Sequence, residues 1–428
     1  PDRIATSKIC RRTTQPLMQP QTSSDASAST PEVLGTTALY RSLALPVFAP
    51  TFIMSACQSS VMLLIPLYAL ELGASPGIAA IIFAIRGLGN MLIDVPAGYA
   101  ASKLGDKFTM VIGISMMIAT AFAASFTQSA MLLSFIAFMF GAAMAIWLLA
   151  RLTFISETIA VVQRGKAVST MAGLQRFGGL AGPVSTGIIA TTFNFEVAFL
   201  CIAAFALVAL VLTLFFVRKN VTVDNPESPH LLRIIPHILS NHRHTFLTAG
   251  IAVSCCTLLR AGRQLLIPLW GESIGLGTNE IGYIVGCAAA VDMTMFPLAG
   301  YLMDNKGRRP ALMLCLAFLS LALLLIPFGN SFIALLACAM LAGFGNGIGS
   351  GINMTMGADF APSAIRGEFL GVWRLMSDAG SFTGPLIIGY IASSFMLAAA
   401  FPVSSAFGLV GMGLVIFGVK ETRQSKSE

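Results

Sequence analysis

Long apolar segments dominate this chain and restrict what it can fold into. From Leu43 to Val419 the sequence runs in segments of roughly 20 apolar residues, which is the length that an α-helix needs to cross the hydrocarbon core of a bilayer. Such continuous segments exclude the strands of a membrane barrel, which alternate in polarity over about ten residues. The sequence therefore predicts an all-α polytopic membrane protein with twelve transmembrane helices, at 43–70, 78–101, 107–128, 130–157, 163–192, 197–217, 244–270, 279–303, 310–327, 331–357, 364–393 and 397–419.

The composition is that of a protein whose surface faces hydrocarbon. Only 11% of the 428 residues are charged, whereas a soluble protein carries about a quarter. The eight cysteines fall mostly within apolar segments and show no metal-ligand spacing, so we expect them to act as small hydrophobic residues. No metal ion and no cofactor is predicted.

The predicted domain organisation is two six-helix bundles, at 43–217 and 244–419, connected by a charged cytoplasmic linker at 218–243. Residues 1–42 are rich in Ser, Thr, Gln and Pro and contain little apolar surface to bury, so we expect a disordered cytoplasmic tail there. An organelle-targeting peptide in this region is the alternative. Residues 420–428 are expected to form a second cytoplasmic tail.

Lysine and arginine are distributed unevenly over the loops. Of the 26 Lys and Arg residues, 20 lie in the two tails and in alternate loops, and the opposite loops contain none. By the positive-inside rule this pattern places both termini and the linker in the cytoplasm. The expected location is a plasma membrane or an inner membrane. The net charge of +7 therefore reflects membrane topology and does not predict nucleic-acid binding.

The remaining six arginines lie inside the apolar segments, together with Asp94, Asp292 and Asp378. A charged side chain near the centre of a transmembrane helix costs roughly 2.5–3.5 kcal/mol on insertion scales, so we expect the arginines to face protein or water. The third, sixth, ninth and twelfth segments have no charge within their apolar runs and are expected to face lipid. The six arginines are Arg86, Arg151, Arg176, Arg260, Arg263 and Arg374.

The two halves of the chain are related by an internal repeat. A shift of 202 residues aligns them without a gap at several separate places. Agreement of this kind at one fixed offset indicates a duplicated six-helix unit with both copies in parallel orientation. The matches are Leu63–Tyr68 on Leu265–Trp270, Gly98-Tyr99 on Gly300-Tyr301, Gly105 on Gly307, Arg164-Gly165 on Arg366-Gly367, and Gly182-Pro183 on Gly384-Pro385.

The loop after the second segment of each half carries a motif. The second-half copy matches Gly-x-x-x-Asp-x-x-Gly-Arg-Arg in full, at Gly300, Asp304, Gly307, Arg308 and Arg309. The first-half copy is degraded, because it keeps Gly98 and Gly105 but has Ser102 at the aspartate position and Asp106 where arginine is usual. With these motifs and the duplicated halves, the chain resembles the major facilitator superfamily over roughly residues 40–420.

The resemblance implies that this loop is a cytoplasmic latch between helices, with Glu157 and Asp359 as partners for the loop cations. The alternative is that the loop charges only mark interfaces and topology. The residues assigned to the latch are Gly98, Gly105, Glu157, Gly300, Asp304, Gly307, Arg308, Arg309 and Asp359.

The resemblance also implies alternating access to a site between the two bundles. Helices 1, 4, 7 and 10 would line the cavity, and helices 2, 5, 8 and 11 would meet across the halves. Arg260 and Arg263 in the seventh segment form a good anion clamp, because each guanidinium group presents a planar fork of donors. An outer gate with Glu71, Glu272 or Glu280 is the alternative for this pair, and a helix–helix hydrogen bond is the alternative for Gln58. The predicted solute-binding residues are Gln58, Arg86, Arg151, Arg176, Arg260, Arg263, Gln264 and Arg374.

Asp292 and Asp378 are the predicted proton-coupling residues. If helix 5 meets helix 8 and helix 2 meets helix 11, Arg176 pairs with Asp292 and Arg86 pairs with Asp378. Burial and a nearby arginine act in opposite directions on a carboxyl pKa, so a movement that separates a pair would switch that balance. Two alternatives remain open: Asp378 pairs with Arg374 within its own helix, or Asp292 is a permanently paired structural residue.

Two matched Gly-x-x-x-Gly-Pro sequences, in the fifth and eleventh segments, predict close helix packing and bending. They resemble the helix-5 motif of superfamily antiporters only in part, because Ser185-Thr186 replace the paired glycines and the usual helix-4 arginine is absent near Ala137. Residues 343–351 are interpreted as a packing or flexible stretch, since they lack the lysine of a phosphate-binding loop. The predicted hinge and packing residues are Gly178, Gly182, Pro183, Gly380, Gly384 and Pro385.

Together these features predict a monomeric secondary active transporter that exports a small organic solute with an anionic or polar-amphipathic character and is driven by protons. The alternatives are proton-coupled uptake of an organic anion and a transporter-like receptor that binds without transport. Enzyme activity is not predicted, because no nucleophile, base or metal set is clustered and the four histidines lie in or beside the linker, at His230, His237, His242 and His244.

Overall fold

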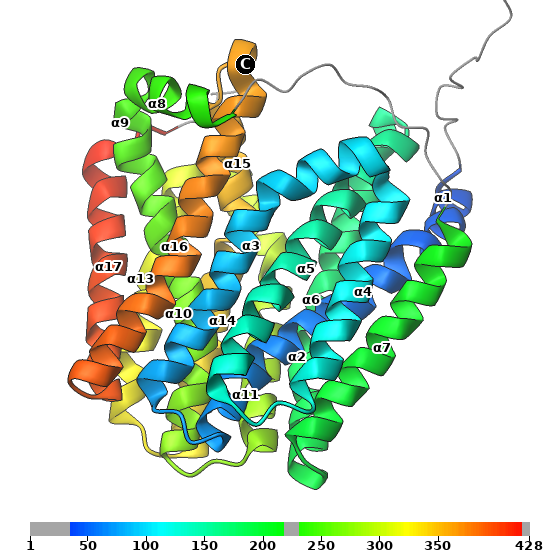
Figure 1. Ribbon diagram of the computed structural model, residues 1–428. Coiled ribbons are helices and arrows are strands. Elements are labelled where there is room, and N and C mark those ends of the chain that lie inside the picture. Colours follow the sequence, from blue (N-terminus) through cyan, green and yellow to red (C-terminus); the bar gives the residue numbers. More distant parts are fainter. Residues whose placement is uncertain (1–34, 218–230, 422–428) are drawn as a thin grey trace, which may run out of the picture.

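The computed structural model describes residues 35–217 and 231–421, and all regular secondary structure within these ranges is helical (Figure 1). The first half contains α1 (Thr36–Leu43), a π-helical turn η1 (Ala44–Phe48), α2 (Ala49–Glu71), α3 (Pro76–Leu104), α4 (Asp106–Ala124), α5 (Ala130–Thr158), α6 (Val161–Thr192) and α7 (Phe195–Phe216). The second half contains α8 (Leu231–Asn241), α9 (Arg243–Thr245), the π-helical turn η2 (Phe246–Gly250), α10 (Ile251–Ser273), α11 (Thr278–Thr294), α12 (Phe296–Asn305), α13 (Arg308–Leu325), η3 (Ile326–Phe328), α14 (Phe332–Ile348), α15 (Ile352–Phe360), η4 (Ser363–Ile365), α16 (Arg366–Ser394) and α17 (Leu397–Gly418).

The repeat found in the sequence is present in the backbone. The turn η1 and helices α2 and α7 begin and end 202 residues before η2, α10 and α17. A side-chain contact also recurs at this offset: Lys107 Nζ donates to the carbonyl oxygen of Leu214 at 2.7 Å, and Arg309 Nη2 donates to that of Ile416 at 2.9 Å. The predicted layout of twelve transmembrane helices in two related halves is therefore confirmed.

The halves differ at two helix breaks. Helices α3 and α5 of the first half are continuous, whereas their counterparts are divided into α11 and α12 and into α14 and α15. The first break falls at Met295, just before Pro297, whose ring supplies no N–H to the helix. The second falls at 349–351, where Gly351 has a φ of 78°, a left-handed conformation that glycine adopts at low cost. Both breaks lie in the same half.

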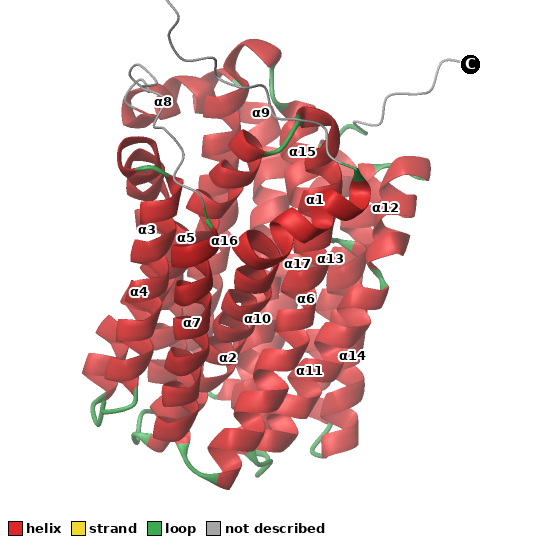
Figure 2. Ribbon diagram, turned by 90° about the vertical axis from the view of Figure 1, so that its right-hand side faces the viewer, coloured by secondary structure: helices red, strands yellow, loops and turns green. Residues whose placement is uncertain are grey.

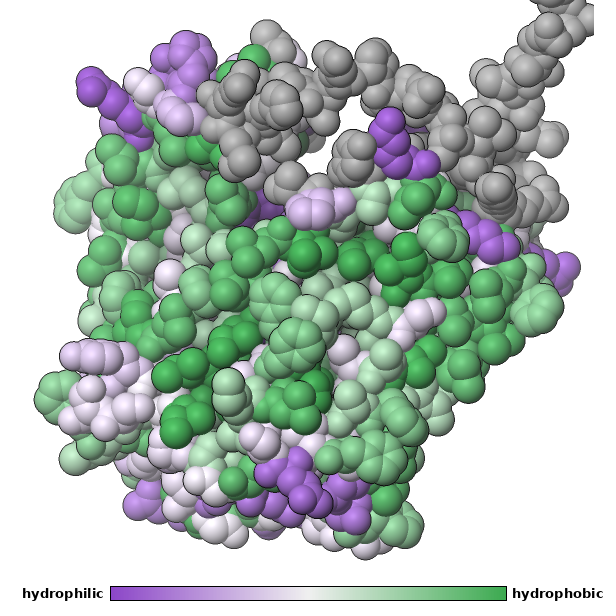
Figure 3. Space-filling model, viewed as in Figure 1, coloured by the Kyte–Doolittle hydropathy of each residue, from purple (hydrophilic) through white to green (hydrophobic). Residues whose placement is uncertain are grey.

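The surface is suited to a membrane. Ten helical segments are long and apolar enough to cross a bilayer by length and composition, and Figure 3 shows apolar side chains over the middle of one face, with hydrophilic residues toward both ends. The two long helices outside this set are α6 and α16, which are enriched in glycine and polar residues. They pack against α11 and α3 of the opposite half. The lower hydropathy of α6 and α16 is therefore explained by contact with protein instead of lipid.

Two parts of the predicted tail and linker are helical. Residues 36–42, predicted to be disordered, belong to α1, which continues through η1 into α2. Within the predicted linker, α8 packs against α16, and its Ile238 is 2% exposed. The amphipathic spacing of apolar residues in this short segment explains that docking. The remaining predicted tail and linker positions, 1–34, 218–230 and 422–428, lie outside the described residues.

One end of the bundle carries α8, the start of α1 and the end of α17 (Figures 1 and 2); it is called the α8 end below. At the opposite end the two halves approach closely: a Cβ on Gly282 would meet the carbonyl oxygen of Pro183, and one on Gly77 would meet that of Gly389. Toward the α8 end, a Cβ on Gly165 of α6 would meet no heavy atom within 4 Å. The halves are thus closed against each other at the end opposite α8.

Candidate solute-binding cavity

A cavity of about 330 Å³ lies between the two halves. Helices α2 and α6 of the first half and α10, α11 and α14 of the second contribute its walls. One part of the lining is apolar and includes Met62, Leu63, Ile267 and Val285. The polar side chains of the lining are Ser59, Gln175, Arg176, Arg263, Gln264, Asp292 and Asn346.

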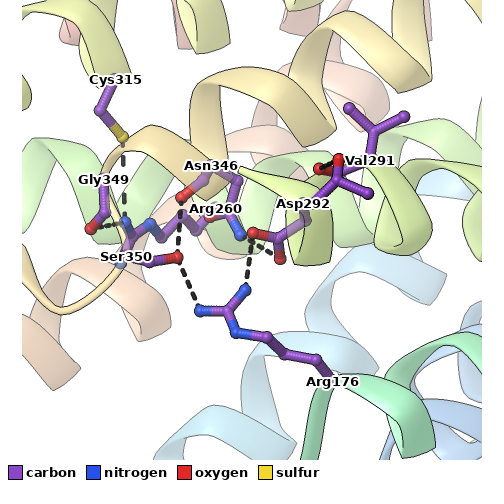
Figure 4. Close-up of polar contacts among 9 residues, drawn as sticks. Arg176, Arg260, Val291, Asp292, Cys315, Asn346, Gly349 and Ser350 are labelled. Carbon is purple, nitrogen blue, oxygen red and sulfur yellow. Dashed lines mark hydrogen bonds and ion pairs between the residues drawn. The ribbon is translucent and has the colours of Figure 1, made fainter. Parts of the chain in front are cut away.

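An ion pair between the halves forms one side of this cavity (Figure 4). Arg176 Nη1 of α6 donates to Asp292 Oδ1 of α11 at 2.8 Å, which is the pair that the sequence predicted. Asn346 Nδ2 of α14 donates to the other carboxylate oxygen at 2.8 Å, and Arg176 Nη2 donates to Ser350 Oγ at 2.6 Å. The guanidinium also lies over the ring of Phe296, 5.0 Å from its centroid. Both oxygens of the carboxylate are therefore engaged.

The network is built on the two helix breaks. Asp292 lies three residues before the break at Met295, and Ser350 lies in the break between α14 and α15. In the second break the Gly349 oxygen accepts a 2.8 Å hydrogen bond from Arg260 Nη2 in addition to a 3.3 Å one from the backbone N–H of Ile352. The two breaks thus turn backbone and side-chain groups of one half toward arginines of α6 and α10.

Arg263 and Gln264 line the cavity from α10, as predicted. The Nε atom of Arg263 is buried and has no hydrogen-bond partner in the described part of the chain. With Arg176 paired to Asp292, the lining carries one positive charge in excess. Unpaired charge in a shielded site favours an anionic ligand.

The other predicted solute-binding residues, Gln58, Arg86, Arg151, Arg260 and Arg374, are not part of the lining. Arg151 is 1% exposed, with its guanidinium 4.4 Å from the ring of Trp147, and its Nη1 donates to Thr51 Oγ1 at 3.2 Å. The neighbour of Gln58, Ser59, occupies the cavity wall in its place. None of the six arginines within the predicted spans is exposed, which agrees with the cost of placing such a charge in lipid.

A second polar cluster joins α3 to α16. Arg374 Nη2 donates to Asp94 Oδ1 at 2.9 Å, and its Nε lies 3.7 Å from Asp378 Oδ2. The predicted pair between Asp378 and Arg86 is therefore wrong in this structure. Asp378 lies one helical turn from Arg374, so the short i,i+4 contact is satisfied within the helix. The guanidinium of Arg86 packs on the ring of Phe83, 4.9 Å from its centroid.

The motif loop of the second half holds α13 to α15. Arg308 Nε forms a 2.9 Å ion pair with Asp359 Oδ2, and the backbone N–H of Arg308 donates to Glu421 Oε1 at 2.9 Å. Gly307 turns the chain with a φ of 106°. The carboxylate of Asp304, in contrast, is exposed and makes no hydrogen bond or ion pair with the described residues, so the contact to α15 runs through Arg308.

The first-half loop has the matching turn. Gly105 has a φ of 82° and separates α3 from α4. A Cβ on Gly98 would be 3.4 Å from Leu149, whereas one on Gly300 would meet nothing within 4 Å. The side chain of Glu157 lies outside the described part of the structure, so the contact between Glu157 and the first-half loop stays a prediction.

The glycines of α6 and α16 permit close helix contacts. A Cβ on Gly178 or Gly182 would collide with α2, and one on Gly380 or Gly384 with α10. Close contacts of this kind are what the predicted packing role requires, and that role stays a prediction. Pro183 and Pro385 lie inside the same helices, and their role as hinges stays a prediction.

Sequence analysis missed Ser59, Gln175, Asn346 and Ser350. Of these, Asn346 was the easiest to detect from the sequence, because it is an amide within an otherwise apolar and glycine-rich run. That run, 343–351, was interpreted as packing, and the glycine pattern gave no sign that the helix would break at its end. The helix break is what brings Ser350 to Arg176.

The fold and the cavity together define a class of protein: a polytopic membrane transporter with two related helical halves around one polar site. The family description "Major Facilitator Superfamily" matches residues 47–291 and 250–428. The chain belongs to this family.

Relatives and solved structures agree with that assignment. A multi-drug resistance efflux pump PmrA homolog of Lactococcus lactis is 24% identical over 371 residues, which cover 84% of this chain and 91% of that protein. Multidrug resistance protein MdtG of Salmonella choleraesuis is 24% identical over 386 residues, with coverage of 86% and 91%. A POT family transporter in complex with a thioalcohol-conjugated peptide has a TM-score of 0.74 at 14% identity, covering 88% of this chain and 95% of that one. The nucleoside transporter NupG has a TM-score of 0.74 at 13% identity, with coverage of 89% and 100%.

Proposed function

We propose that this integral membrane protein is a secondary active transporter that exports a small amphipathic organic anion in exchange for protons. The observation that carries the proposal is the cavity between the halves, whose lining combines Arg263 and the Arg176–Asp292 pair with apolar side chains. A volume of about 330 Å³ is at the lower end of the range for small-molecule sites.

The lining supports an anionic, amphipathic solute. Arg263 offers a planar fork of donors to a carboxylate or a similar group, and Gln264 adds a neutral amide beside it. The apolar side chains Met62, Leu63 and Ile267 would bury a ring or a short hydrocarbon. A cationic solute would have to compete with Arg176 for the only carboxylate in the described lining.

The ion pair between the halves supports proton coupling. Asp292 belongs to the second half and its main partner Arg176 to the first. A rocking movement that separates α6 from α11 would remove the guanidinium from the carboxylate, and loss of an opposite charge favours the protonated acid. Asp378 shares Arg374 with Asp94 across the α3–α16 contact, so the second cluster would respond to the same movement.

Two considerations support export from the cytoplasm. Lys and Arg concentrate in the loops of the α8 end, which favours the cytoplasm for that end, and the halves are closed at the opposite end. The relatives that match along most of the chain are named as efflux pumps.

The test is exchange of three labelled probes in proteoliposomes. The probes share the same aromatic ring and differ in one substituent, which is a carboxylate, a carboxamide or an amine. We expect the carboxylate to exchange fastest, and a pH gradient to drive its net accumulation. Fastest exchange of the amine would contradict the anionic assignment. Saturable binding of any probe without exchange would identify a receptor. Exchange of the carboxylate probe with no accumulation under a pH gradient would contradict proton coupling.

A further inference from the structure

A pair of buried thiols lies beside the cavity, on α10 and α13. The Sγ atoms of Cys256 and Cys315 are 3.6 Å apart, and the two residues are 2% and 0% exposed. A disulfide requires an S–S distance of about 2.05 Å, so the sulfurs need to approach by only about 1.5 Å to reach the bonding distance. The neighbouring Cys255 has no such partner among the described residues.

Arg260 connects this pair to the break between α14 and α15. Its Nη2 atom lies 3.8 Å from Cys315 Sγ and donates to the Gly349 carbonyl oxygen (Figure 4). A cationic group beside a thiol stabilises the thiolate, which is the form that reacts with oxidants. A Cβ on Gly349 would also collide with Cys315 Sγ, so the thiol and the helix break are in direct contact.

We propose that Cys256 and Cys315 form a redox-active pair that closes to a disulfide under peroxide and restrains the α14–α15 break. One thiol, reacting as its thiolate, attacks hydrogen peroxide and becomes a sulfenic acid, and the leaving hydroxide takes up the proton lost from that thiol and departs as water. The second thiol attacks the sulfenic sulfur and releases a second water. The two cysteines lose two electrons in total and the peroxide is reduced. The bond fixes α10 to α13 and alters the sulfur that Arg260 contacts.

The site is tested on the full-length protein in lipid nanodiscs, treated with increasing hydrogen peroxide, alkylated and digested without reduction. Mass spectrometry is expected to find peptides of Cys256 and Cys315 linked and lighter by two hydrogen atoms, and a reductant is expected to separate them. Cys256→Ser must abolish the link, and the matched control Cys255→Ser must keep it. The exposed Cys201 reports that the oxidant worked. Oxidation at Cys201 with no Cys256–Cys315 link at any peroxide concentration overturns the proposal.

The restraint is tested by hydrogen exchange of the backbone at 349–360. We expect severalfold slower exchange in the oxidised protein than in the reduced protein, with no change in Cys256→Ser. Unchanged exchange in a protein that carries the link would show that the break is not restrained. The further expectation, that oxidation slows solute exchange, rests on the proposed function; because both readouts above need no solute, a failure of transport does not affect them.

Discussion

At the scale of single residues, the site depends on which charges are paired and which are not. Arg176 and Asp292 neutralise each other with side chains that are 20% and 14% exposed, whereas the Nε atom of Arg263 is buried without a hydrogen-bond partner among the described residues. Removing one member of a partly buried pair leaves the other charge without compensation, and this costs more than the pair itself contributes. The two arginines are therefore expected to respond differently to the same substitution.

Asp292→Asn keeps the shape of the side chain and removes its charge. We expect it to retain solute counterflow, which needs no net proton movement, and to lose accumulation driven by a pH gradient. The measurement is uptake of the labelled carboxylate probe with and without the gradient. Retained gradient-driven accumulation in Asp292→Asn would exclude this carboxylate as the proton carrier.

A double charge exchange, Arg176→Asp with Asp292→Arg, should recover part of the counterflow lost in each single variant if the pair joins the halves.

Arg263→Gln removes the unpaired charge from the cavity. A hydrogen bond to a charged group contributes about 1.5–3 kcal/mol, so we expect the KM for the carboxylate probe to rise by roughly one to two orders of magnitude, with little change for the carboxamide. The matched variant Arg263→Lys keeps the charge but not the fork of donors and should show a smaller loss. Equal losses for both probes would mean that Arg263 supports the structure and does not contact the solute.

At the scale of helices, small residues determine where the halves can meet. Gly282 of α11 lies against the carbonyl oxygen of Pro183 in α6, so Gly282→Val should prevent closure at the end opposite α8. We expect a Gln264→Cys reporter in the cavity to become reactive, in that variant only, toward a membrane-impermeant maleimide added from the side opposite α8. Gly173→Ala is the control, since its Cβ would meet nothing within 4 Å. An unreactive reporter in Gly282→Val would contradict this account of the closed end.

The break between α14 and α15 depends on Gly351, which has a φ of 78°. A residue with a side chain in this conformation costs roughly 1–2 kcal/mol, so Gly351→Ala should lower the Tm by several degrees, in the range of about 2–4 °C per kcal/mol for domains of this size. Gly367→Ala is the matched control, because Gly367 has open space and no positive φ. A Tm equal to that of the control would mean that the helix tolerates alanine by rearranging.

The sequence allowed most of the helices to be located, but not their breaks. Apolar length and the 202-residue offset indicate where each helix crosses, and the predicted Arg176–Asp292 pair followed from the expected contact between helices 5 and 8. The offset also conceals asymmetry, because it predicts that α11 and α14 should resemble the continuous helices of the first half. Ser350 contacts Arg176 only because the helix breaks at this position. Arg374 contacts Asp378 within the same helix, and a prediction based on contacts between helices did not consider this local pair.

At the scale of the whole molecule, the closed end and the α8 end make a prediction about sidedness. Ala172 lines the cavity, Asn241 is exposed on α8, and Ser394 is exposed at the other end of α16. Single cysteines at these positions report access from each side of a membrane. We expect Ala172→Cys and Asn241→Cys to react with an impermeant maleimide in inside-out vesicles, and Ser394→Cys to react in right-side-out vesicles.

This pattern is expected because the halves are closed against each other at the end opposite α8, and because positive loop charges favour the cytoplasm for the α8 end. The protein without the introduced cysteines is treated in the same way, and the reaction of its native cysteines provides the baseline. Reaction of Ala172→Cys together with Ser394→Cys would place the opening at the wrong end of the molecule. Reaction of Asn241→Cys from the outside would instead reverse the topology and leave the cavity where it is. The two failures are distinguishable, since only a reversed topology changes the side of the membrane from which Asn241→Cys reacts.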